Sequence, residues 1–276
     1  MTMHEATNAA QRLAWNGADA THWVHNRIRL DDMSAPTTDR LFATAAIAAS
    51  ERVLDIGCGT RQTTRLAARI AAHATGVDVS APMLAAARGD AASESLSNID
   101  FIESDAQTHR FDPATFDVAI SRAGVMFFDD TRGAFVNICA SLKPHGRLVF
   151  VCHRQAPGPA GEVVAALTSP LPSASHPAAP SGATDFTDAD QVRDLCRASG
   201  YTAITIEPVD YLSRWGTDVD ETVDFMVDVH LGFLARAMDP AQRDAAKSTV
   251  ADILRGCHTE AGVLVPAAGW AVSARR

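Results

Sequence analysis

A regular alternation of apolar, strand-like runs and helical segments between residues 52 and 153 constrains this chain most. The run RVLDIGCG at 52–59 is almost continuously apolar and ends in glycines, as expected for a parallel strand buried on both faces. Helical and strand-like segments then alternate up to GRLVFVCH at 146–153. Such alternation implies a parallel sheet with helices on both faces and right-handed crossovers. The sequence therefore predicts an α/β fold.

The segments on either side of this alternation are read as additions to the same domain. Residues 5–50 look helical, in three stretches. Residues 156–184 interrupt the rhythm with prolines among small residues, and a loop of this length is usually functional or disordered. A helix, a strand, two helical stretches and a closing strand are expected after it. A chain of 276 residues suits one domain with embellishments better than two independent domains.

The composition argues against several classes of partner and location. A net charge of −9 at pH 7 disfavours nucleic acid, because phosphate binding depends mainly on Lys and Arg. Arg61, Arg65 and Arg69 recur every four residues and are read as a solvated helix face. No apolar run approaches the ~20 residues that cross a membrane, and the N-terminus lacks a signal pattern. The five cysteines form no C-x-x-C pair, so we expect a cytoplasmic protein.

A glycine-rich turn follows the first strand, and an acidic residue ends the second. Gly57 and Gly59 let the backbone turn tightly and approach a ligand that a Cβ atom would exclude. Asp78 comes about 20 residues later, where it can accept hydrogen bonds from ribose hydroxyls. Ligands of open α/β sheets bind beyond the carboxyl ends of the strands. These features predict a nucleoside-binding site without specifying the nucleoside.

Two further carboxylates narrow the choice of ligand. Asp55 lies just before the glycines, where it would repel a pyrophosphate but suit a ligand that carries an amine. The third strand ends in ESDA at 103–106, where a side chain can accept a hydrogen bond from an adenine amino group. A turn, LKPHGRL at 142–148, precedes the fifth strand.

Five short motifs, VLDIGCG, GVDVS, SDA, SRAGVMFF and LKPHGRL, occur in this order over roughly residues 50–155. In order and spacing the segment resembles the class I S-adenosylmethionine-dependent methyltransferase family, particularly the branch that acts on small molecules. The resemblance implies a Rossmann-like, doubly wound, seven-stranded sheet of order 3-2-1-4-5-7-6, with the last strand antiparallel. It also implies a helical N-terminal lid and a helical cap.

The same resemblance implies S-adenosylmethionine as cofactor and S-adenosylhomocysteine as product. In the family the first loop holds the methionine part, the acid after the second strand holds the ribose, and the acid after the third strand holds adenine. The cofactor-binding residues that it implies lie after successive strands and on the lid: Asp55, Gly57, Cys58, Gly59, Asp78, Val79, Asp105, Ala106, Ser121, Trp23 and Arg29.

Candidates for the acceptor side come from the fourth and fifth strands and the late helices. His153 ends the fifth strand, where a histidine of near-neutral pKa can remove a proton from a hydroxyl. Met126, Phe127 and His230 are predicted to bind substrate. Each has a plainer interpretation as ordinary packing, as do Trp15 and Trp23 on the lid. His22 and His25 lack the partners of a zinc site, so no metal is expected.

One departure from the family pattern keeps two alternatives open. The glycine loop usually reads G-x-G-x-G, but Arg61 stands at the third glycine position. A module that binds S-adenosylmethionine or its product without turnover is therefore one alternative. An NAD(P)-dependent oxidoreductase is the other, although Gln62 stands where a dinucleotide fingerprint needs glycine.

The predicted organisation is a single domain that acts on a small-molecule substrate, as a monomer or a homodimer and with no nucleic acid or membrane partner. Its parts are a lid at 1–50, a cofactor-binding core at 51–155, a cap at 156–184 and 218–260, and a terminal strand at 261–276. The acceptor atom, whether oxygen, nitrogen or carbon, is not specified by the sequence.

Overall fold

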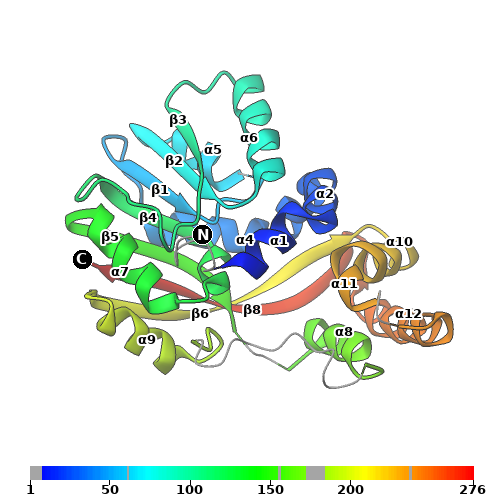
Figure 1. Ribbon diagram of the computed structural model, residues 1–276. Helices are drawn as coiled ribbons and strands as arrows, with labels where there is room; N and C mark the ends of the chain where they lie inside the picture. The colour runs from blue at the N-terminus through cyan, green and yellow to red at the C-terminus, as the bar shows by residue number, and fades with distance from the viewer. Residues whose placement is uncertain (1–7, 61, 155–156, 172–183, 236–237) are drawn as a thin grey trace.

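A mixed sheet runs through the centre of the molecule, with helices on both faces and a helical extension at one end (Figure 1). The computed structural model describes residues 8–60, 62–154, 157–171, 184–235 and 238–276. The strands are β1 (Arg52–Ile56), β2 (His73–Asp78), β3 (Ile99–Glu103), β4 (Phe116–Arg122), β5 (Leu142–His153), β6 (Thr202–Gly216), β7 (His258–Thr259) and β8 (Gly262–Arg275).

The strand order is β3-β2-β1-β4-β5-β8-β6. The first five strands are parallel, and β8 lies antiparallel between β5 and β6. The two-residue β7 pairs only with β8. Because β8 is the seventh long strand along the chain, the Rossmann-like α/β fold and the strand order predicted from the sequence are confirmed.

The central strands are apolar because helices cover both faces of the sheet. The helices that flank it are α5 (Gln62–Ala68), α6 (Ala81–Ser93), α7 (Thr131–Ser141), α9 (Ala189–Ala198) and the 3₁₀ turn η1 (Gly124–Phe127). Leu54 of β1 packs with Phe135 of α7, whereas Val53 packs with Ala67 of α5, and all four are fully buried. Adjacent residues of β1 thus face opposite layers. Ser80 caps α6 by accepting from the Met83 amide.

The described part of the N-terminal region contains four helices, namely α1 (Ala9–Asn16), α2 (Ala18–His25), α3 (Arg27–Met33) and α4 (Ala35–Ala45). The second stretch expected from the sequence is divided at Asn26. The Asn26 side chain donates to the His22 carbonyl oxygen at 2.8 Å, and this local bond competes with helix continuation. We refer to α1–α4 as the lid.

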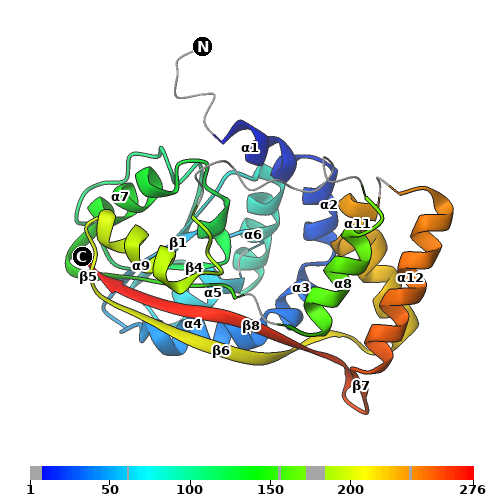
Figure 2. The ribbon, with the colours of Figure 1, turned by 90° about the horizontal axis from the view of Figure 1, so that it is seen from below.

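The cap consists of α8 (Pro159–Thr168), α10 (Val219–Asp224), the π-helix η3 (Phe225–His230), α11 (Gly232–Ala235) and α12 (Pro240–Arg255). Helix α8 forms inside the segment that the prolines marked as a loop; Pro159 occupies its first turn, where a missing N–H is harmless. Figure 2 shows β6 and β8 running as a long ribbon from the sheet to the cap. Val163 of α8 and Val250 of α12 are fully buried there in a second hydrophobic cluster.

No helix in the described parts of the chain is long and apolar enough to cross a membrane.

Candidate functional site

The glycine turn after β1 makes a close backbone contact with the turn after β4. Gly57 and Gly59 have φ values of 61° and 55°, in the left-handed region that glycine tolerates without strain. A Cβ atom on Gly57 would lie 2.8 Å from the Gly124 Cα atom. Gly57 and Gly124 therefore allow two strand-end loops to pack directly against each other at the carboxyl edge of the sheet.

Asp78 ends β2 with its carboxylate fixed between two backbone amides. The Gly59 N–H donates to one oxygen at 2.7 Å, and the Ser80 N–H donates to the other at 2.9 Å. The turn after β1 and the start of α6 thus orient this side chain. The sequence predicted that Asp78 lies beside the glycine turn, and the geometry brings them together.

Asp55 lies behind the glycine turn. Its side chain is fully buried, and one carboxylate oxygen accepts from the hydroxyls of Thr63 and Thr64 at 2.6 and 2.7 Å. Both threonines belong to the first turn of α5, where a carboxylate also interacts favourably with the helix dipole. The carboxylate therefore holds α5 onto β1. Its role toward the cofactor stays a prediction, since the structure places it beneath the loop.

Ser121 and Cys58 also have structural partners in this region. The Ser121 hydroxyl donates to the Ile56 carbonyl oxygen at 2.8 Å and accepts from the Val125 amide at 3.2 Å, which ties β4 to the end of β1. The Cys58 sulfur contacts Gly76 of β2, where an added Cβ atom would lie 2.8 Å from it. Both side chains are buried, so they shape the loops from inside.

Asp105 follows β3, and its carboxylate is covered by a residue that the sequence did not single out. The Asn8 side-chain amide donates to both Asp105 oxygens at 3.1 Å, and the Gln107 N–H donates to one of them at 2.9 Å. Asp105 is 2% exposed, and Ala106 beside it is also buried. Asn8 was missed because a lone Asn in a polar N-terminal segment gives no periodic or motif signal.

A row of rings connects the turn after β4 with the cap; we call it the aromatic row. Trp15 contacts Phe127 and Trp23 edge-on, with ring centroids 5.5 and 5.6 Å apart. Trp23 lies 5.7 Å from His230, which stacks on Phe225 at 6.1 Å. The row brings the predicted substrate residues Phe127 and His230 together with the lid. Phe127 remains 41% exposed.

The two candidate histidines lie at the end of β5 and at the end of η3 in the cap. Burial, with smaller effects from His153 and Arg29, lowers the pKa of His230 to about 4. Its Nδ1 atom is buried with no hydrogen-bond partner among the described residues. Desolvation by the surrounding protein also lowers the pKa of His153, although this residue stays exposed at its rim. The His230 imidazole is therefore neutral at pH 7, and its low pKa makes it a poor proton acceptor.

Two other predicted residues lie to either side of the aromatic row. The Arg29 guanidinium lies 3.7 Å from the Phe225 ring centroid, donates to the Trp215 carbonyl oxygen and pairs with Glu221, so it joins the lid to the cap. Met126 of η1 is partly buried and packs against the main hydrophobic core. Their assignments to cofactor and substrate stay predictions.

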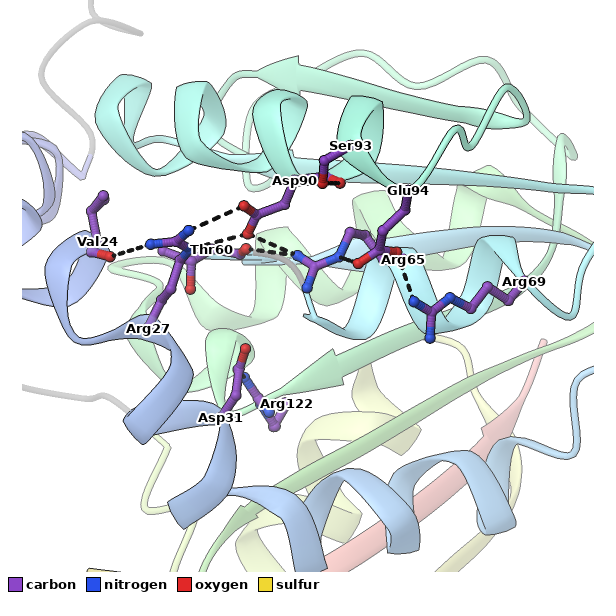
Figure 3. A network of polar contacts seen from close by, with 10 residues as sticks. All are labelled: Val24, Arg27, Asp31, Thr60, Arg65, Arg69, Asp90, Ser93, Glu94 and Arg122. Atoms are coloured by element: carbon purple, nitrogen blue, oxygen red, sulfur yellow. Dashed lines mark hydrogen bonds and ion pairs between the residues drawn. The ribbon is translucent and has the colours of Figure 1, made fainter. Parts of the chain in front are cut away.

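A network of charged side chains joins α3, α5 and α6 near the glycine turn. Figure 3 shows Arg27 of α3 and Arg65 of α5 reaching the Asp90 carboxylate from opposite sides. Arg65 also pairs with Glu94 at 2.8 Å. The reading of this arginine repeat as a solvated face is therefore wrong for Arg65, whose side chain is 15% exposed. A helical repeat alone cannot reveal carboxylates that a neighbouring helix supplies.

Arg122, at the end of β4, makes a second connection between the lid and the core. It pairs with Asp31 of α3 at 2.9 Å and donates to the Thr38 hydroxyl at 2.8 Å. It also donates to Gln62 at the start of α5 at 2.9 Å. These contacts fix α3 and α4 against the strand ends.

The residues at the strand ends fit an adenosine-containing cofactor. The positive-φ glycines leave two positions of the turn without a Cβ atom, and Asp78 and Asp105 supply carboxylate acceptors at the ends of adjacent strands. Arg61, the departure in the glycine loop, lies outside the described residues. Within the described ranges, His, Cys, Asp and Glu form no cluster of three or more that would suit a metal.

Comparison with known proteins identifies a methyltransferase domain in this chain. Residues 54–150 match a family model described as a methyltransferase domain. The aklanonic acid methyltransferase DauC of Streptomyces sp. strain C5 is 33% identical over 127 residues, which cover 44% of this chain and 52% of that protein. The chain spans about half or less of the length of the first curated relatives that it matches.

Solved structures share the fold at low sequence identity. The phosphoethanolamine N-methyltransferase 2 of Haemonchus contortus, bound to phosphomonomethylethanolamine and S-adenosylhomocysteine, has a TM-score of 0.55 at 20% identity and covers 87% of this chain and 52% of its own. The [4+2]-cyclase SpnF has a TM-score of 0.55 at 24% identity, covering 87% and 79%. The second likeness shows that this fold also occurs in a protein named for another reaction.

Proposed function

Since the chain belongs to the class I S-adenosylmethionine-dependent methyltransferase family, we propose that it transfers the methyl group of that cofactor to a small-molecule acceptor. The observation that carries the proposal is the pairing of a strain-free glycine turn with the Asp78 carboxylate that it orients. The acceptor atom is oxygen, nitrogen or carbon.

Asp78 and Asp105 supply the acceptors that the cofactor's nucleoside part needs. When bound, S-adenosylmethionine supplies a sulfonium methyl group that an acceptor displaces, leaving S-adenosylhomocysteine. Asp78 would accept from the ribose hydroxyls, and Asp105 from the adenine amino group. Gly57, Gly59 and Ser121 fix the loops on either side. Positioning of this kind supplies much of the acceleration in a displacement reaction.

The aromatic row would exclude water from the acceptor side. A cavity of about 10 Å³ beside Trp23, Phe225 and His230 has room for about one water molecule. In this closed arrangement an acceptor enters only when the lid and the cap separate. Apolar rings on both sides favour an acceptor with an apolar or aromatic body.

His153 is the proposed proton acceptor for a hydroxyl substrate. It would take the proton from the acceptor oxygen as the new O–CH₃ bond forms. Because its pKa is lowered, the imidazole stays neutral to a more acidic pH than an ordinary histidine does. His153→Gln should lower kcat by about 10- to 100-fold and remove the acid limb of the pH–rate profile. An unchanged profile would exclude His153 as the base.

The same site also suits a protein that binds S-adenosylmethionine or its product without turnover. The feature that favours it is Arg61, which replaces the third glycine of the family's G-x-G-x-G loop in the sequence. A dinucleotide is disfavoured, because Gln62 stands where the dinucleotide fingerprint G-x-G-x-x-G has its third glycine. The Gln62 side chain also accepts a hydrogen bond from Arg122.

Transfer of a labelled methyl group tests the proposal. The purified protein is incubated with methyl-labelled S-adenosylmethionine and a panel of phenols, carboxylic acids, amines and carbon acids. We expect label in one acceptor class and none with Asp78→Ala. Binding of the cofactor without transfer to any member would favour the non-turnover alternative.

The division into lid, core, cap and terminal strand, the choice between monomer and homodimer, and a cytoplasmic location remain parts of the proposal. The cysteines are consistent with that location, since all five are buried thiols without a disulfide.

A further inference from the structure

Asn8, the residue before α1, is held by Asp105, which follows β3, and by Asp129, which lies between η1 and α7. Its backbone N–H donates to the Asp129 carboxylate at 2.7 Å, and its side-chain oxygen accepts from the Asp129 N–H at 2.9 Å. Its amide nitrogen lies 3.1 Å from both oxygens of Asp105. Asn8 is 3% exposed although it belongs to the N-terminal segment. Because both polar atoms of the Asn8 side chain are hydrogen-bonded, the start of α1 docks on the core at one defined position.

The contact with Asp105 is chemically the same as the contact proposed for adenine. In both cases an NH₂ group on a planar, conjugated carbon donates to a carboxylate. Asp105 is 2% exposed, and its oxygens accept from Asn8 and from the Gln107 N–H. An incoming amino group therefore reaches this carboxylate only after the Asn8 amide has left it.

The opposite end of α1 is fastened in the same way. The Asn16 amide donates to the Val79 carbonyl oxygen at 2.9 Å, and its oxygen accepts from the Ala81 N–H at 3.0 Å. Val79 follows Asp78, the proposed ribose acceptor. Helix α1 thus lies from the end of β3 to the end of β2, across the edge that the nucleoside would occupy.

Asparagine suits this position for two reasons. Asn8 has φ 59°, and Asn is among the few residues other than Gly that adopt the left-handed region readily. Its amide is neutral, so its bond to the carboxylate is weaker and more easily exchanged than an arginine pair would be. These properties describe a reversible contact.

We propose that Asn8 occupies the adenine-amino position on Asp105, so that α1 is a self-closing gate that competes with the cofactor. This inference rests on the proposed function, because it assigns Asp105 to adenine. The apparent affinity for the cofactor is then reduced by the fraction of molecules in which α1 is docked.

Calorimetric titration with S-adenosylhomocysteine and with adenosine tests the gate. Asn8→Gly removes the amide and keeps the positive φ without strain. Asn8→Asp places a carboxylate beside Asp105 and opens the gate by repulsion. Both variants should bind both ligands about 5- to 50-fold more tightly than the wild type, and Asn16→Ala should do so by a smaller factor.

Asn98→Ala is the matched control. Asn98 donates to backbone carbonyl oxygens at 2.8, 3.1 and 3.4 Å, but it precedes β3 at the opposite edge of the sheet. The Asn98→Ala variant should bind S-adenosylhomocysteine and adenosine as tightly as the wild type does. Thermal unfolding of each variant confirms that it is folded before titration.

The possible outcomes distinguish a failure of the gate from a failure of the proposed function. If the wild type binds S-adenosylhomocysteine and the Asn8 variants bind equally or more weakly, the gate is wrong and Asn8 instead supports the closed site. If neither the wild type nor the folded variants bind either ligand, the proposed function fails, and the gate fails with it. Tighter binding by both variants, with Asn98→Ala unchanged, supports the gate.

Discussion

The two ends of the lid are attached to the core by different kinds of contact. Helix α3 is held by two guanidinium–carboxylate pairs, Arg27 with Asp90 and Arg122 with Asp31, and α4 is held by the hydrogen bond from Arg122 to the Thr38 hydroxyl. Helix α1 is held by the neutral amides of Asn8 and Asn16. We call α3 and α4 the root of the lid and α1 its tip.

The root of the lid also buries its apolar side chains more completely than the tip does. Leu41 of α4 is fully buried in the core, whereas Leu13 of α1 is 78% exposed. The root contacts join a guanidinium to a carboxylate, whereas at the tip the donors are neutral and only Asn8 has carboxylate partners; buried apolar surface adds to the attachment of the root. From this difference we expect the root to stay folded with the sheet when the tip opens. A lid built in this way admits a cofactor without unfolding the domain.

The largest expected effect comes from breaking the root. Arg122→Ala leaves Asp31 half-buried without its ion pair and also removes bonds to Thr38 and Gln62. We expect the free energy of unfolding to fall by about 2–3 kcal/mol, measured by urea titration. Arg69→Ala is the control, since Arg69 is 53% exposed and should change stability by less than about 0.5 kcal/mol. Equal effects would mean that the root is not held by Arg122.

A pH-dependent contribution is expected where α4 meets the sheet. Arg147 pairs with both oxygens of Glu51 at 2.7 and 2.8 Å and donates to the Ala45 carbonyl oxygen at the end of α4. The hydrogen bond from Arg147 lowers the pKa of Glu51 below its ordinary 4.5. The lowered pKa stabilises the fold above pH 4.5, and this contribution is lost as pH falls through the folded value.

Glu51→Gln tests that contribution. The variant should be less stable than the wild type by about 1–2 kcal/mol at pH 7, and the difference should shrink toward pH 3. A difference that is the same at both pH values would show that the pairing with Arg147 does not depend on the charge of Glu51.

The smallest effect on stability is expected at the tip. Asn16→Ala and Asn8→Gly should each lower the free energy of unfolding by less than about 1 kcal/mol, because α1 opens before the domain unfolds. Hydrogen exchange should show faster exchange for amides of α1 than for those of α4 in the wild type. Equal protection of the two helices would remove the distinction between root and tip.

The sheet could be predicted from the sequence, because the residues that specify each strand and turn are close together along the chain. Burial on both faces requires runs such as 52–56, and a left-handed turn favours Gly57 and Gly59. Asp78 could be placed because the spacing between strand ends follows from the βαβ unit.

The lid contacts could not be predicted in this way. Asn8 and Asp105 are separated by 97 positions, and Arg122 and Asp31 by 91. Their pairing depends on where α1 and α3 dock, which no short pattern encodes. The proximity of Trp23 and His230 has the same origin: single side chains on distant helices meet only after the cap has packed.

The central claim is that the strand ends hold S-adenosylmethionine through Asp78, and calorimetric titration tests it most directly. The protein is titrated with S-adenosylmethionine, S-adenosylhomocysteine and NAD, and again as Asp78→Ala and Asp100→Ala. Asp100 is the control, because its side chain is 72% exposed on β3 and pairs with His73. The account predicts saturable binding of both sulfur ligands, lost in Asp78→Ala and kept in Asp100→Ala, with no binding of NAD. Absence of binding to either sulfur ligand, or binding that survives Asp78→Ala, would contradict it.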